Sequence, residues 1–283
     1  MTPIAVTGST GLLGGRIARR LAQAGVAQRL LVRDVGRAPE LAGADAVTAE
    51  YGDTDSVAAA LDGLGTVLMV SASETPDRVD RHRSFVDGAV RAGVAHLVYI
   101  SFFGASPTAT FTLARDHWAT EEHIKQSGLD YTFLRDNLYA DFFEQMVGED
   151  GVIRGPSADG RVAAVAQDDI ADAAAAVLRA PADHRGATYN LTGPESLTFD
   201  QVADTITSVT GRQVGFRNET IDEAYASRAH YGAPGWQVDA WVSTYTAIAS
   251  GELDGVSDDV EKLSGHRATS VAELLQRQRA AAG

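Results

Sequence analysis

The first half of the chain alternates two patterns of apolar residues. Short runs of Val, Ile and Leu predict buried strands, and the segments between them are rich in Ala, with apolar residues at helical spacing. This alternation is typical of a parallel sheet with helices on both faces. We predict strands at 4–7, 29–33, 46–50, 66–71, 96–101 and 131–134, and helices at 12–24, 54–62, 77–92 and 114–127.

Glycines mark the expected ends of three of these helices. Gly25, Gly93 and Gly128 each follow the last residue of a helical pattern. Glycine is favoured there because it adopts the left-handed backbone conformation without strain. Together with the six strands, these ends predict an α/β fold with a Rossmann-type, doubly wound parallel sheet.

The pattern changes after residue 135. A short strand of Val and Ala is predicted near 161–166, between turn residues, and the helix that follows opens with acidic residues and stops at Pro181. Strand, loop, helix and strand then follow between 187 and 218, with Thr198 placed to cap the start of the helix and Gly211 its end.

This change predicts two domains. We expect an NAD(P)-binding Rossmann domain at 1–150 and a smaller, mostly helical substrate lobe at 151–283. The strands near 161–166 and 187–218 are expected to interleave with the main body. No repeat or low-complexity linker separates the two parts.

Composition and charge narrow the class of protein. Lys and Arg total 24 against 38 Asp and Glu, a formal net charge of −14, so a nucleic acid would be repelled. The absence of cysteine excludes disulfides and thiolate sites. The glycine loop begins at residue 8, which leaves no room for a signal peptide, and no apolar run is long enough for a membrane span. We expect a cytoplasmic protein, monomeric or homodimeric, with no nucleic-acid or membrane partner.

The stretch GSTGLLGG at 8–15 joins the first predicted strand to the first helix. In that context Gly8 permits a tight turn, Gly11 lets the backbone approach a pyrophosphate, and Gly14 lets helix and strand pack closely. The start of the helix adds free N–H groups for phosphates. The alternative is a tight turn with no ligand, but the full alternating pattern favours a dinucleotide.

The end of the second strand indicates which dinucleotide. LLVRD places Arg33 where an acidic residue would be expected to bind the ribose 2′-hydroxyl of NAD. A guanidinium pairs instead with a 2′-phosphate, so NADP(H) is favoured. Asp34 beside it is the competing feature, and Arg37 is a possible helper or a solvated side chain.

Two further polar stretches should line the same crevice, beyond the carboxyl ends of the strands. The fourth strand ends in VSASE, which contains Ser71 and Ser73, and the sixth ends in LRDNLYADF. Taken singly, each of these residues is equally compatible with an ordinary polar loop.

The stretch LARDHWATEEHIK sets His117 and Glu121 four residues apart, and hence on one helix face. A metal site is disfavoured because His123 points to a different face and no HExxH sequence is present. A serine hydrolase is excluded by the lack of a G-x-S-x-G elbow after a strand.

Taken in order, several stretches resemble the NmrA-like atypical short-chain dehydrogenase/reductases, and among them the NADPH-dependent quinone and triphenylmethane reductases. They are AVTGSTGLLG, LLVRD, AEYGDTDSVAAAL, VSASE, RHRSFVDGAVRAGVAHLVYIS, LARDHWATEEHIKQSGLDYTFLRDNLYADF and LSGHRATSVAELL, which span nearly the whole chain. The resemblance implies that Glu50 and Tyr51 lie near the adenine. It also implies cofactor contacts from Gly8, Ser9, Thr10, Gly11, Leu12, Leu13, Arg33, Ser73, Asp136, Asn137, Leu138, Tyr139, Ala140 and Asp141.

The chain departs from the wider superfamily at its proton donor. Most short-chain reductases carry Tyr-x-x-x-Lys on the helix after the fifth strand, and the matching positions here are His117 and Glu121. A ketone needs an acid as hydride arrives, whereas a quinone or cationic dye gives a delocalised product. If an acid is used, His117 is one candidate, with Glu121 raising its pKa, and His82 and Tyr139 are rivals.

Two functions remain open at this point. One is an oxidoreductase that transfers hydride from NADPH to a quinone or similar conjugated acceptor. The other is a non-catalytic, NADP(H)-binding redox sensor, which the resemblance also includes and which the missing Tyr/Lys pair fits as well.

Overall fold

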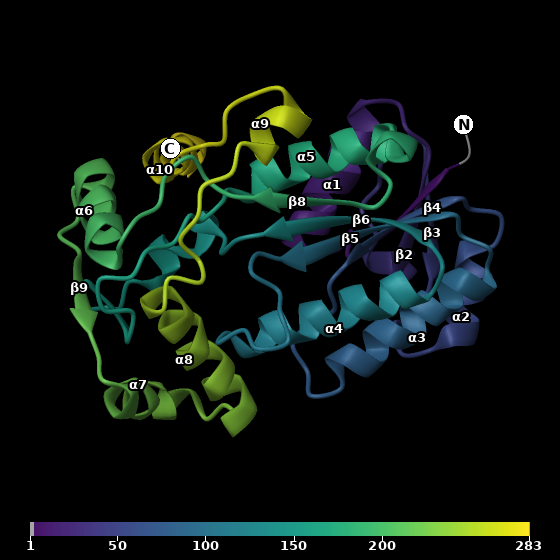
Figure 1. Ribbon diagram of the computed structural model, residues 1–283. Coiled ribbons are helices and arrows are strands. Elements are labelled where there is room, and N and C mark those ends of the chain that lie inside the picture. Colours follow the sequence, from purple (N-terminus) through teal and green to yellow (C-terminus); the bar gives the residue numbers. More distant parts are fainter. Residues whose placement is uncertain (1–2, 283) are drawn as a thin grey trace. The chain divides into compact units, whose positions relative to one another are not determined.

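The computed structural model describes residues 3–282 (Figure 1), and the chain forms two compact units. The first unit contains the chain up to Phe102, then Asp116–Arg135 and Ile170–Tyr189. The second contains Phe103–Arg115, Asp136–Asp169 and the chain from Asn190 onward. The chain passes between the two units several times. The domain division at residue 150 expected from the sequence stays a prediction.

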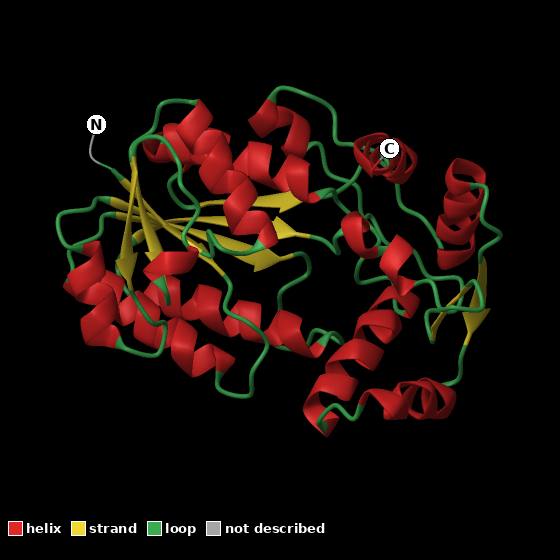
Figure 2. Ribbon diagram, turned by 180° about the vertical axis from the view of Figure 1, so that it is seen from behind, coloured by secondary structure: helices red, strands yellow, loops and turns green. Residues whose placement is uncertain are grey.

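The first unit is built around a seven-stranded sheet with helices on both of its faces. Figures 1 and 2 show α1 and α5 over one face and α2, α3 and α4 over the other. The strands are β1 (Ile4–Thr7), β2 (Gln28–Val32), β3 (Ala44–Thr48), β4 (Thr66–Val70), β5 (His96–Phe102), β6 (Asp130–Asp136) and β8 (Ala187–Leu191). The helices are α1 (Leu12–Gln23), α2 (Thr54–Leu61), α3 (Arg78–Arg91), α4 (Thr112–Gln126) and α5 (Gln167–Arg179), with short 3₁₀ turns η1 (Val35–Arg37) and η4 (Pro181–His184).

The strand order identifies the place where a ligand is expected. The order is β3-β2-β1-β4-β5-β6-β8, and β1 runs parallel to both β2 and β4. The order reverses between β1 and β4, and open α/β sheets bind ligands beyond the carboxyl ends of the strands at such a point. The predicted fold class is confirmed, and all six predicted strands and four predicted helices of the first half are present.

The helix ends are also as predicted. Gly25, Gly93 and Gly128 have positive φ values of 73°, 74° and 82°. This is the left-handed region, where a residue with a side chain would be strained.

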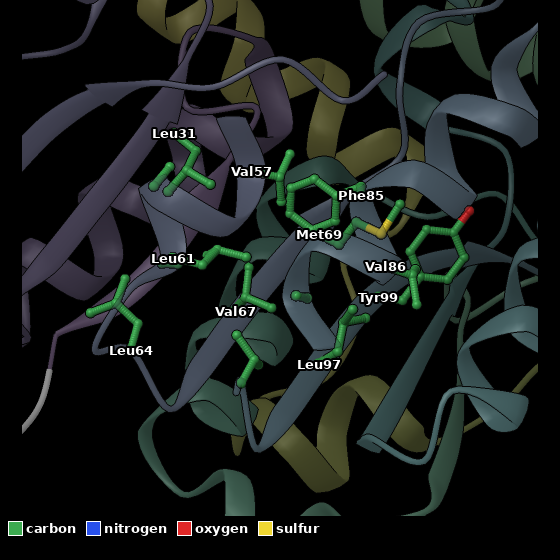
Figure 3. Close-up of a cluster of buried hydrophobic side chains, with 14 of the residues drawn as sticks. Leu31, Val57, Leu61, Leu64, Val67, Met69, Phe85, Val86, Leu97 and Tyr99 are labelled. Atoms are coloured by element: carbon green, nitrogen blue, oxygen red, sulfur yellow. The ribbon is translucent and has the colours of Figure 1, made fainter. Parts of the chain in front are cut away.

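One large hydrophobic cluster joins the sheet to helices α2 and α3 (Figure 3). Val67, Met69 and Leu97 from the strands are completely buried, together with Phe85 from α3. Each such side chain stabilises the fold by about 1.5–3 kcal/mol through its removal from water. The ring of Tyr99 belongs to the same cluster (Figure 3), and its hydroxyl group enters a polar network described below.

The second unit contains a small parallel sheet of two strands, β7 and β9. Phe199 stacks on Phe216 with ring centres 5.5 Å apart, and Tyr245 lies 5.3 Å from the Phe199 ring centre. Its strands are β7 (Val152–Gly155) and β9 (Gly215–Asn218), and its helices are α6 (Phe199–Thr210), α7 (Ile221–Arg228), α8 (Gly235–Ala249), α9 (Asp259–Ser264) and α10 (Val271–Ala282), with 3₁₀ turns η2 (Ala140–Phe142), η3 (Glu144–Met146) and η5 (Ala229–Tyr231).

Helix α6 begins and ends as the sequence predicts. The Thr198 side chain accepts from the backbone of Gln201, whose own side chain returns the bond, and Gly211 ends the helix with φ 73°. Such reciprocal bonds satisfy two N–H groups that the first turn would leave without partners.

The strand predicted at 161–166 is wrong. Only isolated bridges occur there, between Val162 and Leu197 and between Tyr139 and Val165. The reason is that successive backbone groups bond to different segments: Val162 to Leu197, Ala163 to Leu253 and Val165 to Leu138. No single neighbouring strand follows the segment, so no ladder forms. The short strand β7 just before it was not predicted.

Among residues 3–282, no helix is both long and apolar enough to cross a membrane.

Candidate cofactor and catalytic site

The glycine loop after β1 is shaped by close contacts between backbone groups. Gly8 has φ 67°, and a Cβ at Gly14 would lie 2.3 Å from the Gly8 carbonyl oxygen. The backbone N–H of Gly11 donates to the same oxygen over 2.9 Å. The loop is therefore closed on itself so tightly that positions 8 and 14 exclude a side chain, as the motif predicts.

The same loop presents groups that are suited to a ligand. Helix α1 begins at Leu12, and the residue before it, Gly11, has no side chain to cap it, so the helix start leaves backbone N–H groups without intrahelical partners. The Ser9 hydroxyl is buried and has no hydrogen-bond partner among the described residues. Leu12 is 61% exposed, whereas Leu13 is buried in the core and can offer only its backbone. Free donors beside an uncapped helix start fit a phosphate group.

The ends of β1 and β4 are joined by a side chain. Thr7 Oγ1 donates to Leu68 O over 3.1 Å and accepts from Val70 N over 2.9 Å. The Tyr51 hydroxyl contacts Thr7 Oγ1 over 2.6 Å, and its ring stacks on Phe85. Burial raises the pKa of Tyr51 well above its usual range. Tyr51 thus helps to hold the point where the strand order reverses.

Arg33 follows β2 directly and is exposed. The neighbouring carboxylate of Asp34 accepts a hydrogen bond from Gly36 N over 2.9 Å and so caps the turn η1. Asp34 is therefore directed into its own loop, while Arg33 and Arg37 make no ion pair with other described residues. This arrangement favours Arg33 over Asp34 as the group that meets a ribose substituent. Glu50, after β3, is exposed as well.

The loop after β4 carries Ser71 and Ser73 and is held in place by helix α3. The N–H of Ala72 donates to His82 Nε2 over 2.9 Å. The carbonyl of Ala72 accepts from Arg78 Nε over 3.0 Å. Sequence reasoning did not find Arg78, which is only 4% exposed.

His82 uses both ring nitrogens within the protein. Because Nε2 accepts from Ala72, the proton of the neutral ring is assigned to Nδ1, which donates to Thr120 Oγ1 over 2.8 Å. Thr120 in turn donates to Asp116 O. Burial and the charge of Arg78 lower the pKa of His82 to about 3. His82 thus holds the β4 loop through Nε2, and its one ring proton is engaged with Thr120.

His117 is buried in a second branch of this network. Arg78 Nη2 donates to His117 Nε2 over 3.1 Å, so the Nδ1 proton points to the Tyr99 hydroxyl 3.0 Å away. Burial, followed by the charge of Arg78, holds the pKa of His117 well below its usual value. The expectation that Glu121 raises this pKa is therefore wrong, and His117 is neutral.

Glu121 lies on the same buried face of α4 but binds other partners. Arg135 donates to it twice, over 2.8 Å and 2.6 Å, and Ser101 Oγ donates over 2.6 Å. His123 instead pairs with Asp87 over 2.7 Å. The two histidines and Glu121 thus have three separate sets of partners and do not converge on a common point.

The remaining predicted residues belong to the second unit. Tyr139 donates to Asp136 Oδ2 over 2.8 Å. Asn137 is completely buried: its backbone N–H donates to Leu191 O, and its side chain contacts Leu253 O and Leu138 N. These contacts fix the backbone of the segment that follows β6.

Four residues of the α4 networks were not found from the sequence: Arg78, Tyr99, Ser101 and Arg135. Their positions at the start of α3, within β5 and near the end of β6 carry no local motif. One general rule could have identified them from the sequence. A polar residue within an otherwise apolar strand, or at a buried helix start, needs a hydrogen-bond partner.

Comparisons with known proteins give the family. The model of the NmrA-like family matches residues 2–228. Quinone oxidoreductase 2 of Escherichia coli is 33% identical over 280 residues, covering 96% of this chain and 97% of that protein.

Two solved structures are similar over the full length. The NADPH-dependent quinone oxidoreductase of Escherichia coli, complexed with NADPH, has a TM-score of 0.90 at 31% identity, covering 98% of this chain and 99% of that one. The triphenylmethane reductase of a Citrobacter species, complexed with NADP(H), has a TM-score of 0.87 at 32% identity, covering 97% and 99%. The glycine loop after β1 and the strand order agree with these matches. The chain belongs to the NmrA-like family.

Proposed function

We propose that this chain is an NADPH-dependent oxidoreductase that delivers hydride to a quinone or a similar electrophilic conjugated acceptor. The predicted class of enzyme and the predicted cofactor, NADP(H), are supported by the two similar structures, which carry NADPH and NADP(H). The acceptor class is supported by the names of these relatives, a quinone oxidoreductase and a triphenylmethane reductase.

The acceptor class is supported most by the polar face of helix α4, whose side chains are buried and bonded within the protein. His117 and Glu121 occupy the positions of the usual Tyr/Lys pair, and both are buried with all their charged or titratable atoms in hydrogen bonds. A neutral, fully bonded His117 is poorly suited to protonate an alkoxide. A positioned acid accelerates such a reduction by roughly 10²- to 10⁴-fold. An acceptor whose product is delocalised needs far less of this acceleration.

The chain's residues would divide the work of holding the cofactor. The uncapped helix start and the backbone of Gly8–Leu13 suit the pyrophosphate, with Gly14 keeping the helix close. Arg33 suits the 2′-phosphate by bidentate pairing. Glu50 and the loop Ser71–Ser73 complete the proposed set within the first unit. For the segment Asp136–Tyr139 of the second unit, a cofactor contact stays a prediction from the resemblance. When bound, the nicotinamide supplies the hydride, and the protein contributes position and exclusion of water.

A proton donor is not required for this function. Tyr139 remains a proposed candidate, because its hydroxyl is paired with Asp136 in the segment that we assign to the cofactor. A cytoplasmic location and a monomeric or homodimeric state, both expected from the sequence, stay predictions.

The test is an NADPH-oxidation assay with matched acceptors. We expect turnover with a benzoquinone, a naphthoquinone and a triphenylmethane dye, and little with a simple ketone of similar size. Tight NADPH binding without turnover of any acceptor would favour the non-catalytic sensor. Ketone reduction at the quinone rate would show that a proton donor has been overlooked.

A further inference from the structure

The peptide of Ala72, in the loop after β4, is held on both sides by buried side chains of one helix. His82 accepts from its N–H over 2.9 Å, and Arg78 donates to its carbonyl over 3.0 Å. Both side chains come from α3, one helical turn apart, and neither is exposed beyond 4%. We call Arg78, His82 and the Ala72 peptide the β4-loop clamp.

The clamp is itself fixed by helix α4. His82 donates to Thr120 over 2.8 Å, and Arg78 donates to His117 over 3.1 Å. The second terminal nitrogen of Arg78 lies 3.6 Å from the carboxylate of Asp116. Each clamping side chain is thus anchored at its far side, which restricts its rotamer and the position of the peptide that it holds.

A purely structural need does not explain this choice of residues. Burying a guanidinium is costly, and well-packed apolar residues often replace buried charges with no loss of stability. Among residues 3–282, the carboxylate that pairs with Arg78 is that of Asp116, and its distance of 3.6 Å is longer than a hydrogen bond, so the pair recovers little of this cost. Its hydrogen bonds go to a loop carbonyl and to a histidine. What these bonds provide is a fixed loop backbone.

We propose that Arg78 and His82 are positioning residues of the cofactor site, which hold Ser71 and Ser73 where NADPH binds. The loop follows β4 at the point where the strand order reverses, beside the glycine loop after β1. The inference rests on the proposed function. In this proposal the loop after β4 forms one wall of the site. Its conformation is fixed by a buried network of side chains and not by the loop's own sequence.

The experiment compares three single variants for NADPH affinity and thermal stability. His82→Leu removes the acceptor for Ala72, and His82→Gln keeps an oxygen that can accept the same N–H. His96→Leu is the matched control, because His96 is also a buried histidine, 4% exposed, and bonds Thr132 over 2.8 Å, but it lies at the amino end of β5, away from the carboxyl ends of the strands. Affinity is measured by NADPH fluorescence, well below each melting temperature.

We expect His82→Leu to weaken NADPH binding about tenfold, which is the order of effect of losing the one hydrogen bond that holds the loop. His82→Gln should stay close to the unsubstituted protein. His96→Leu should lower the melting temperature without changing the affinity. An unchanged affinity in His82→Leu, or an equal loss in His96→Leu, would overturn the clamp.

A second variant covers the case in which His82→Leu does not fold. Arg78→Lys keeps the charge, but a single ammonium cannot reach both Ala72 O and His117 Nε2 as the guanidinium does. We expect the KM for NADPH to rise while kcat at saturation changes little. A fall in kcat with unchanged KM would contradict positioning. If the unsubstituted protein fails to bind NADPH, the proposed function and the clamp both fall, whereas normal binding in Arg78→Lys refutes the clamp alone.

Discussion

The glycine loop and the polar face of helix α4 belong to the same unit and are organised in opposite ways. The loop leaves groups open: an uncapped helix start, a buried Ser9 hydroxyl with no hydrogen-bond partner in residues 3–282, and an exposed Leu12. The α4 face closes on itself: His117 and Glu121 are buried, and both have internal partners.

The difference separates binding groups from structural ones better than residue type does. Histidine and glutamate are the more reactive residues, yet here both are buried and their side chains are bonded to other groups of the protein. Glycine and leucine carry no chemistry, yet they leave the free donors and the apolar surface that a ligand would use. The predictions below test each side of this contrast.

The largest effect is expected from closing the loop with a side chain. In Gly14→Val the Cβ would meet the Gly8 carbonyl carbon and oxygen at 2.5 Å and 2.3 Å, which leaves no room without moving the backbone. We expect NADPH binding to be lost and stability to fall by more than the usual overpacking cost of about 1–3 kcal/mol. Calorimetric titration and thermal melting measure both. Gly65→Ala is the control, since a Cβ there meets nothing within 4 Å.

The closed face of α4 should fail when a partner is removed. In Arg135→Met, the buried Glu121 carboxylate keeps its hydrogen bond from Ser101 but loses both bonds and the ion pair from Arg135. We expect the free energy of unfolding to fall by about 3 kcal/mol, in the range for breaking a buried pair. Lys125→Met breaks an exposed pair with Glu122 and should cost less than about 1 kcal/mol. Urea unfolding measures both variants. An equal loss of unfolding free energy in the two would show that the buried Arg135–Glu121 pair is no more important than the exposed one.

A smaller, selective effect is expected at the open edge beyond β2. Arg33→Asp should weaken NADPH binding on the order of 100-fold, or about 2.7 kcal/mol, and NADH binding far less, because a carboxylate repels the 2′-phosphate. Asp34→Asn should leave the NADPH to NADH ratio unchanged, since Asp34 caps its own turn. Dissociation constants for both nucleotides check this, and equal losses for the two in Arg33→Asp would refute the assignment.

The smallest effect concerns pH. The folded pKa of His82, about 3, lies below the ordinary 6.5, so the unfolded chain takes up a proton first and stability falls as pH drops below about 6.5. Between roughly pH 7.5 and 5.5 this removes about 1.4 kcal/mol, and His82→Gln should make the decline shallower by that amount. Chemical unfolding at several pH values measures it. A parallel decline in both proteins would mean that His82 is not held neutral.

Local motifs predicted what depends on local geometry. Gly8 and Gly14 could be assigned because their steric roles arise within a few residues, and Thr198 and Gly211 because helix caps are equally local. The segment 161–166 could not be predicted, because its backbone partners come from Leu197, Leu253 and Leu138.

The role of His117 was out of reach for the same reason. The spacing of His117 and Glu121 predicted a shared face, which the structure bears out through the burial of both. It could not predict that Arg78, 39 residues earlier, would donate a hydrogen bond to the ring of His117. Nor could it predict that Ser101 and Arg135 would donate to the carboxylate of Glu121. Burial lowers the pKa of His117 most and the charge of Arg78 lowers it further, and both depend on how distant parts of the chain pack.

The interrupted course of the first unit also bears on how the protein is made. Strand β6 ends at Asp136, but its neighbour β8 begins only at Ala187. A ribosome therefore releases six strands of the sheet while the last one is still unsynthesised, and β6 remains an open edge on the nascent chain. Open edges invite pairing with other chains. While residues 137–186 are translated, the edge of β6 lacks its partner strand, and such transiently exposed edges are what chaperones protect.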